Sequence, residues 1–282
     1  MASFKEMKKN RMSNLENLSK QVEKLAEKPS YEDDRIWKCE RDKSGNGYAV
    51  VRFLPASNNE DVPWVQLWSH GFKGPGGWYI ENSLTTLGKD DPVSKANTAL
   101  WNSGIESDKN IARDRKRKLS YYSNILVLED SANAENEGKV FLFRYGKKIF
   151  EKITSVMNPE FKDETPLNPF DFWTGANFKI KIRQVEGYAN YDKSEFADPT
   201  PLYDGDDKKC EEVWNQQHSL KEFVSPENFK SYQELEARFN TVVARDAGGE
   251  FVGTIEESTD DPVASGDKGD DSLEYFKKLA EQ

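Results

Sequence analysis

The sequence predicts an α+β protein with a small β-barrel at its core. Many short segments show the two-residue alternation of half-buried strands, and only a few show the apolar spacing of helices. The composition adds a third observation, because 36% of the 282 residues are hydrophobic while 12% are aromatic. A chain that is poor in aliphatic residues but rich in rings suggests that some rings face a ligand.

Residues 1–28 are predicted to form a basic arm and a short amphipathic helix. A capping box, Ser13-x-x-Glu16, starts the helix at Asn14, and Pro29 ends it. So short a helix is marginal alone, so its apolar face must dock on its own domain or on a neighbouring copy. The cations of the arm are Lys5, Lys8, Lys9 and Arg11, and the apolar face consists of Leu15, Leu18, Val22 and Leu25.

Residues 29–245 are predicted to form the folded core. In its last strand, Phe178, Ile180 and Ile182 alternate with cations at 179, 181 and 183, which indicates a buried face and a cationic face. Helices are expected over 147–157, 206–223 and 229–243. The expected strands are 48–54, 64–69, 78–81, 121–128, 139–145 and 177–188.

Residues 246–282 are predicted to be a largely disordered acidic tail. This segment contains eleven acidic residues and three lysines, so it carries −8 of the net charge of −10. Gly, Ser, Asp and Pro dominate it as far as Asp270, which is typical of disorder. A short amphipathic piece with Leu273, Phe276 and Ala280 on one side closes the chain.

Several classes of protein are disfavoured. The sequence has no phosphate-binding loop, no dinucleotide-binding glycine motif and no nucleophile elbow, so no enzyme is predicted. Its two cysteines, Cys39 and Cys210, are far apart, which fits a reducing compartment. Neither a membrane-spanning run nor a signal peptide is seen, so we expect a soluble intracellular protein without membrane contacts.

The candidate ligand-binding groups combine cations with aromatic rings. Four cations at 115–118 are followed closely by two adjacent tyrosines, and single-stranded nucleic acid needs such charges for phosphates and such rings for unpaired bases. For each ring alone, packing in the core is the more common role. The candidates are Arg115, Lys116, Arg117, Lys118, Tyr121, Tyr122, Phe143, Arg144, Tyr145, Lys179, Lys181, Arg183, Tyr188 and Tyr191.

A set of ordered sequence blocks resembles one known family. The chain is similar over roughly residues 1–245 to the single-stranded DNA-binding, helix-destabilising proteins of T-even-like phages. The blocks are Gly-Asn-Gly-Tyr-Ala-Val-Val-Arg-Phe-Leu-Pro (45–55), His-Gly-Phe-Lys (70–73), Trp-Tyr-Ile-Glu (78–81), Lys-Arg-Lys-Leu-Ser-Tyr-Tyr-Ser-Asn-Ile-Leu (116–126), Asn-Glu-Gly-Lys-Val-Phe (136–141), Tyr-Gly-Lys-Lys-Ile (145–149) and Gly-Tyr-Ala-Asn-Tyr-Asp (187–192).

The resemblance implies an oligonucleotide-binding (OB) barrel with a cleft for one DNA strand. It also implies an N-terminal arm that joins neighbouring copies along DNA, through Lys8, Lys9, Arg11 and Ser13, and an acidic tail that recruits replication and recombination proteins in the cytoplasm of the infected bacterial host. The residues that it places in the cleft are Arg52, Lys73, Lys116, Arg117, Lys118, Tyr121, Tyr122, Phe143, Tyr188 and Tyr191.

One departure from the family concerns a metal. The resemblance implies a structural zinc held by one His and three Cys, but only His70 matches, and Ser83, Asp91 and Ser94 stand at the approximate cysteine places. Because a serine hydroxyl is a poor zinc ligand, we expect no zinc and no other cofactor. Packing is expected to hold this part of the fold instead, through Trp78, Leu84, Leu87 and Trp101.

These features predict a passive, sequence-tolerant and cooperative single-stranded DNA-binding protein that acts in DNA replication, recombination and repair. The tail is expected to compete with DNA for the same cations. The main alternative is a single-stranded RNA-binding translational regulator, which could use the same rings and charges. A nuclease would need a carboxylate cluster in the cleft, which the sequence does not indicate, and a plain scaffold is the remaining rival.

Overall fold

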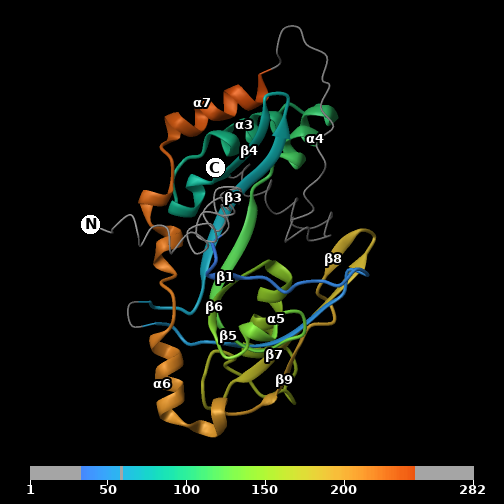
Figure 1. Cartoon of the computed structure of the whole chain (residues 1–282). Coiled ribbons are helices and arrows are strands. Elements are labelled where there is room, and N and C mark those ends of the chain that lie inside the picture. The colour runs from blue at the N-terminus through green and yellow to red at the C-terminus, as the bar shows by residue number, and fades with distance from the viewer. Residues whose placement is uncertain (1–32, 58–59, 245–282) are drawn as a thin grey trace, which may run out of the picture. The chain divides into compact units, whose positions relative to one another are not determined.

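The computed structural model describes residues 33–57 and 60–244 (Figure 1). By its internal contacts the chain divides into residues 1–36 and residues 37–282, and the fold described below is that of the second unit. The predicted arm and tail lie outside the described residues. The strands and α-helices are β1 (Ile36–Trp37), β2 (Gly47–Phe53), β3 (Val65–Gly74), β4 (Gly77–Asn82), α3 (Pro92–Asn102), α4 (Glu106–Asp114), β5 (Lys118–Asp130), β6 (Val140–Tyr145), α5 (Lys147–Met157), β7 (Ala176–Val185), β8 (Tyr188–Asn190), β9 (Glu195–Pro199), α6 (Asp207–Asn215) and α7 (Tyr232–Val243).

The described strands form one sheet of nine strands. Its hydrogen-bonded order is β1-β6-β5-β2-β7-β8, with β3 beside β5, β4 beside β3 and β9 beside β7. The pairings among β2 to β9 are antiparallel. The predicted α+β class is confirmed, whereas the order of the described strands does not return to its first strand to close a barrel.

Strand β5 links the two halves of this unit. Its first residues, Lys118 to Tyr122, pair with β3, and its later residues, from Ile125, pair with β2, while β6 lies along its other edge. Figure 1 shows β3 and β5 running between the α3–α4–α7 region and the strands around α5. Most of the side chains of β5 are buried, because other parts of this unit cover both faces of the strand.

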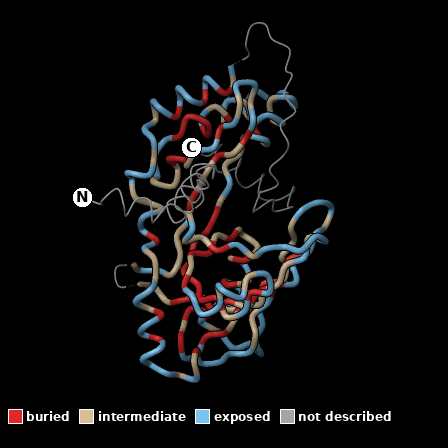
Figure 2. Tube along the Cα trace, in the orientation of Figure 1, coloured by how far each residue is buried: buried red, intermediate tan, exposed pale blue. Residues whose placement is uncertain are grey.

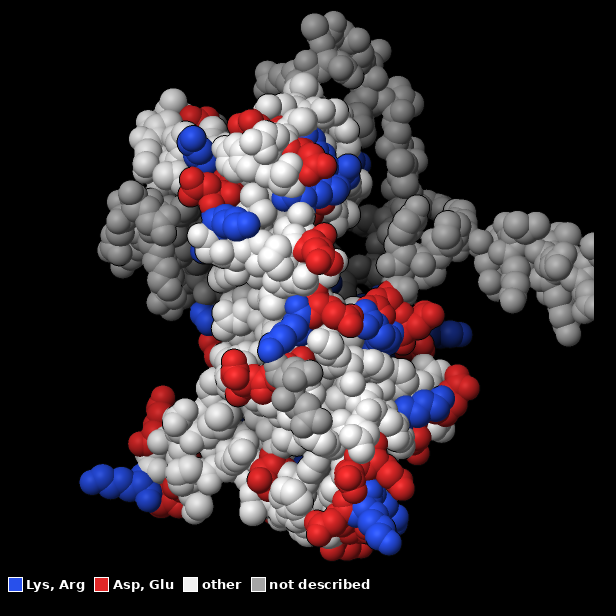
Figure 3. Space-filling view, turned by 90° about the vertical axis from the view of Figure 1, so that its left-hand side faces the viewer, with Lys and Arg blue, Asp and Glu red and all other residues white. Residues whose placement is uncertain are grey.

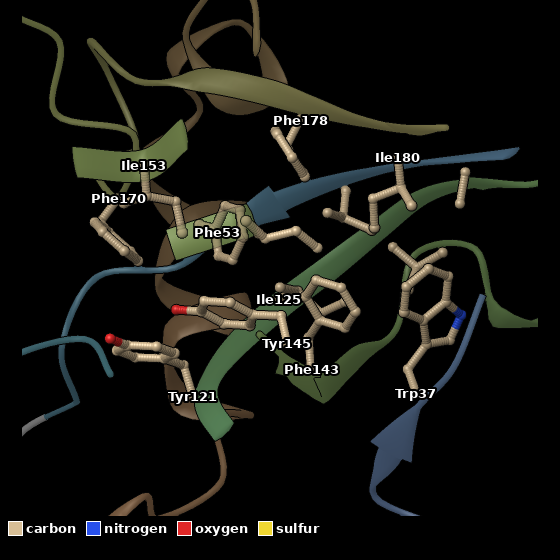
Figure 4. Packing of buried hydrophobic residues seen from close by; sticks show 14 of the residues in the cluster. Trp37, Phe53, Tyr121, Ile125, Phe143, Tyr145, Ile153, Phe170, Phe178 and Ile180 are labelled. Atoms are coloured by element: carbon tan, nitrogen blue, oxygen red, sulfur yellow. The ribbon is translucent and has the colours of Figure 1, made fainter. Parts of the chain in front are cut away.

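The main core consists of aromatic and aliphatic side chains from β2, β5, β6, β7 and α5 (Figure 4). Phe53 lies at its centre with no exposed surface, and its ring meets those of Tyr145 and Phe170 edge-on at centroid distances of 5.8 and 5.6 Å. Burial of one such side chain contributes roughly 1.5–3 kcal/mol. Figure 2 shows buried residues concentrated along the strands, with exposed residues in the outer loops.

A second core lies between the β3–β4 hairpin and α7. Phe72 and Tyr79 stack at 5.1 Å, and the ring of Phe239 from α7 meets both edge-on. The helix begins with a capping box formed by Ser231 and Glu234. The hairpin turn touches the end of α7 so closely that a Cβ atom at Gly76 would lie 2.2 Å from the carbonyl oxygen of Thr241, so only glycine fits there.

Most of the predicted elements are observed. The strands predicted from 48–54 to 139–145 and the helix at 147–157 match β2 to β6 and α5. The strand predicted over 177–188 ends early because Glu186 and Gly187 have positive φ, the geometry of a two-residue hairpin turn that leads into β8. The helix predicted over 206–223 was too long, because α6 ends at Asn215, and α3 and α4 were not predicted.

Candidate nucleic-acid interface

The basic run at 115–118 connects α4 to β5. Arg115 is the C-cap of α4, and β5 begins at Lys118. The Arg115 guanidinium lies over the rings of Phe72 and Phe239, at 5.6 and 5.7 Å from their centroids, and burial lowers its pKa. The Arg115 side chain therefore packs on the second core, and this packing competes with its predicted role in phosphate binding.

The remaining cations of the run differ in exposure. Lys116 and Arg117 are half-buried, and Lys118 is exposed. The guanidinium of Arg117 lies 4.1 Å from the centre of the Trp68 ring, which is a close cation–π contact. These three cations therefore present charge where the chain passes from α4 into the sheet.

Three rings that were predicted to be exposed are buried. Tyr121, Tyr122 and Phe143 are each 5% exposed, so the prediction of their exposure is wrong. Tyr121 stacks on Phe150 at 4.0 Å, and Tyr122 stacks on Phe223 at 4.2 Å. Tyr121 and Tyr122 lie on β5, whose two faces are both covered, and Phe143 of β6 packs in the main core. Direct contact of these rings with DNA stays a prediction, and it would require the covering groups to move.

Arg52 is also buried, with no exposed surface. Its guanidinium donates hydrogen bonds to the side-chain oxygen of Asn177 at 3.2 Å and to the carbonyl oxygens of Asp171 and Thr200 at 2.7 and 3.1 Å. Burial lowers its pKa, which the charge of Asp171 partly offsets. The side chain expected to line the cleft thus ties β2 to the loops around 171 and 200, and its contact with DNA stays a prediction.

The alternation predicted for β7 is confirmed. Phe178, Ile180 and Ile182 are buried, while the cations at 179, 181 and 183 point outward. The outward face is partly neutralised, because Lys181 forms an ion pair with Glu195 of β9 at 2.7 Å. The Cα atoms of Lys179 and Glu195 are also paired across the strands, and the hydrogen bond from Lys181 and the charges of both lysines lower the pKa of Glu195.

The two tyrosines around β8 differ from each other. Tyr188 is 49% exposed and begins β8, so its ring is available to a ligand. Tyr191 is half-buried against the main core, and burial raises the pKa of its hydroxyl. Of the predicted stacking rings, Tyr188 is therefore the best placed.

The strand register places several of the predicted cations on the same surface as Trp78, a ring that was expected to pack inside the fold. Lys73 pairs with Trp78 across β3 and β4, Ser69 pairs with both Asn82 and Lys118, and Tyr122 pairs with Arg144. Because paired residues in antiparallel strands share a face, these residues lie on one side of the sheet. We call this surface the β3–β5 face and define it by Ser69, Gly71, Lys73, Trp78, Ile80, Lys118 and Arg144.

The part of the β3–β5 face formed by Gly71, Trp78 and Ile80 is open to solvent. Trp78 is 58% exposed and Ile80 is 67% exposed, and a Cβ atom at Gly71, opposite Ile80, would meet no other atom within 4 Å. The assignment of Trp78 to packing is therefore wrong. Its alternation with buried Tyr79 was the signal in the sequence that could have placed it outside.

On the face drawn in Figure 3, the surface charge is mixed rather than uniformly basic. Figure 3 shows Lys and Arg side chains interspersed with Asp and Glu, with wide uncharged areas between them. On such a surface, exposed rings have to contribute alongside the cations if a nucleic acid is to bind. No helix within the described part of the chain is long and apolar enough to span a bilayer.

The positions corresponding to the family's zinc ligands lie together but do not suit zinc. Nε2 of His70 lies 3.2 Å from Oδ1 of Asp91, both side chains being 1% exposed. Oδ1 also accepts the backbone N–H of Ser94, and Oδ2 accepts the Ser83 hydroxyl and the Leu84 N–H. Only the imidazole and the carboxylate are ligands that zinc favours, and the carboxylate is already engaged. Within residues 33–57 and 60–244 no group of three or more His, Cys, Asp and Glu could hold a metal ion.

An exposed ring beside cations on an open sheet face, as at Trp78, is typical of proteins that bind single-stranded nucleic acids. Comparison with known proteins is consistent with this class. The family model described as gp32 DNA binding protein like matches residues 45–243, and the chain belongs to this family.

Curated relatives cover most of the chain. It is 40% identical over 248 residues to the single-stranded DNA-binding protein of Enterobacteria phage T2, which is 86% of this chain and 82% of the relative. It is also 40% identical over 233 residues to the protein of the same name from Enterobacteria phage T4, which is 82% of this chain and 77% of the relative.

Proposed function

We propose that the chain binds single-stranded DNA with little preference for base sequence. The observation that carries this proposal is the exposed indole of Trp78 directly across from Lys73 on the open β3–β5 face. The names of the T2 and T4 relatives support DNA as the ligand, and the comparisons give no support to the RNA-binding alternative.

The strand is held by two kinds of contact in this proposal. Bases stack on Trp78 and Tyr188, since stacking on an exposed ring tolerates any base. Phosphates are bound by the accessible cations, which are Lys73, Lys116, Arg117, Lys118, Arg144, Lys179 and Lys181. Because the protein binds unpaired strands and not duplex, mass action keeps DNA single-stranded without any catalytic step.

The wider organisation is part of the proposal. The core over 29–245 is assigned in this proposal to a partly open OB-type barrel, since the described strands do not close into a ring. The arm at 1–28 joins neighbouring copies through Lys8, Lys9, Arg11 and Ser13, and the tail at 246–282 binds replication and recombination proteins. The setting that fits these roles is DNA replication, recombination and repair in the cytoplasm of an infected bacterium.

Tryptophan fluorescence titrated with poly(dT) at several salt concentrations tests the central claim. We expect the logarithm of the affinity to fall linearly with that of the salt concentration, with a slope of about −0.7 for each bound phosphate. Duplex DNA and poly(U) are the controls, and both should bind more weakly. Equal affinity for duplex and single strands would overturn the proposal, and equal affinity for poly(U) would favour an RNA-binding protein.

The proposed role of the arm has its own test. Removing residues 1–13 should lower cooperativity more than intrinsic affinity, because the deleted cations contact a neighbouring copy. Oligonucleotides that hold one protein molecule report intrinsic affinity, whereas poly(dT) reports both quantities. An equal loss of affinity on the short and long strands would show that the arm contacts DNA instead.

A further inference from the structure

The carbonyl oxygen of Arg115, at the start of the basic run, is fixed by two buried side chains. His70 of β3 donates from Nδ1 at 3.0 Å, and Asn97 of α3 donates from Nδ2 at 3.1 Å. The exposed fractions of His70 and Asn97 are 1% and 0%. A carbonyl at the end of a helix has no intrahelical partner, so these two donors satisfy it and fix the point where α4 ends.

The orientation of the His70 ring is itself fixed. Because a carbonyl can only accept, Nδ1 carries a hydrogen, and Nε2 faces Oδ1 of Asp91 at 3.2 Å. When Nε2 is protonated this contact is an ion pair, although it is not aligned as a hydrogen bond. Ser83 and Leu84 hold the other carboxylate oxygen. A continuous series of contacts thus runs from Ser83 and Leu84, at the start of a short 3-10 helix, through Asp91 and His70 to Arg115.

These contacts lie at the positions where the resemblance described above implies zinc ligands. Since the donors present do not suit zinc, the same region must be held by another kind of bond. Two positions that correspond to cysteines, Ser83 and Asp91, hydrogen-bond to each other at 3.0 Å, and Ser94 contributes its backbone N–H to Asp91. Packing, which was predicted from the sequence to hold this region together, is therefore supplemented by hydrogen bonds.

We propose that His70, Asp91 and Asn97 are positioning residues for DNA binding, which hold the cations at 116–118 in place through the carbonyl of Arg115. The inference rests on the proposed function. In this inference, a polar network without a metal ion fixes the segment between α4 and β5. The guanidinium of Arg115, packed on Phe72 and Phe239, anchors the same residue from its other end.

The test measures the affinity of the full chain for fluorescein-labelled oligo(dT) over a range of salt concentrations. His70→Gln and Asn97→Ala should weaken binding by roughly threefold to tenfold, and should reduce the salt slope by about 0.7 for each phosphate that the variant no longer binds. Thr98→Ala is the matched control, because Thr98 is the next residue of α3 and its hydroxyl donates to the carbonyl oxygen of Ser94 in its own helix. The control should match the wild type in affinity and slope.

The salt slope distinguishes a role in positioning the cations from a role in the stability of the fold alone. A purely structural role would lower the midpoint of thermal unfolding and leave the slope unchanged in the folded protein, and that outcome would overturn the inference. Should His70→Gln fail to fold, Asp91→Asn, which keeps the shape of the side chain, provides the same comparison. Stoichiometric zinc in the purified wild type, with loss of binding on chelation, would also overturn it. Failure of the wild type to bind oligo(dT) would instead refute the proposed function.

Discussion

Asp91 is a buried carboxylate at the N-cap of α3. Burial alone would raise its pKa, but the polar contact and charge of His70, with hydrogen bonds from Ser94 and Ser83, lower the pKa from 3.8 to about 2. A carboxyl group with a lowered pKa stabilises the fold above its unfolded-state pKa, and this contribution is lost as the pH falls through the folded-state pKa.

We therefore expect Asp91→Asn to lower the free energy of unfolding by roughly 2 kcal/mol at neutral pH. The difference from the wild type should shrink as the pH falls from about 4 to about 2, because Asp91 loses its charge in this window. Urea unfolding of both proteins at closely spaced pH values measures it. A difference that stays constant through this window would show that the charge of Asp91 contributes nothing.

Trp78 gives a second prediction for a single residue. A base stacked on an exposed ring contributes roughly 1–3 kcal/mol, so Trp78→Ala should weaken binding of oligo(dT) by roughly fivefold to a hundredfold. Its thermal midpoint should change little, since the side chain is 58% exposed. Trp173→Ala is the control, because Trp173 is 52% exposed and lies off the β3–β5 face. An equal loss of affinity for oligo(dT) in the two variants would show that the interface is not centred on Trp78.

Arg52 and Trp78 show that the type of a residue does not by itself predict whether its side chain is buried. An arginine is expected at a surface and a tryptophan in a core, yet Arg52 has no exposed surface and Trp78 is mostly exposed. The carbonyl groups that accept hydrogen bonds from Arg52 belong to residues 171, 172 and 200, far away in the chain. Such partners become apparent only when the fold brings them together.

Among the elements, β7 and β9 together set the charge of one surface. The carboxylate of Glu195 pairs with Lys181 and lies across from Lys179, so it competes with any phosphate for both lysines. We expect Glu195→Gln to bind oligo(dT) more tightly at low salt, with a salt slope larger by about 0.7 for each additional phosphate that is bound. Asp198→Asn, on the same strand but without this ion pair, is the control. Unchanged binding by Glu195→Gln would exclude this face from the interface.

Elements with a strong pattern were predictable, and elements fixed by distant contacts were not. The alternation of β7 follows from its own residues, because one face packs on the main core and the other meets solvent. Helix α3 has a start signal in Asp91 and Pro92, but its apolar stripe of Val93, Ala96 and Leu100 is short and is interrupted by Asn97. Its place depends on contacts of Asp91 and Asn97 with β3 and α4, which the sequence pattern does not contain.

On the scale of the whole molecule, charge is divided unevenly along the chain. Residues 246–282 carry −8 of the net charge of −10, so residues 1–245 are close to neutral and include the cations of the β3–β5 face. In the proposed function, this segment competes with DNA for those cations. Salt screens interactions between exposed charges over about 10 Å at 0.1 M, so the competition should weaken as salt rises.

Deleting residues 246–282 should therefore tighten binding of oligo(dT) at low salt and change it little at high salt. A second variant keeps the length but replaces the eleven acidic residues of this segment with Asn and Gln, which separates charge from bulk. If charge is the cause, both variants should bind alike and more tightly than the wild type. If only the deletion binds more tightly, the segment obstructs DNA by its volume, and if neither does, it does not compete for the cations at all.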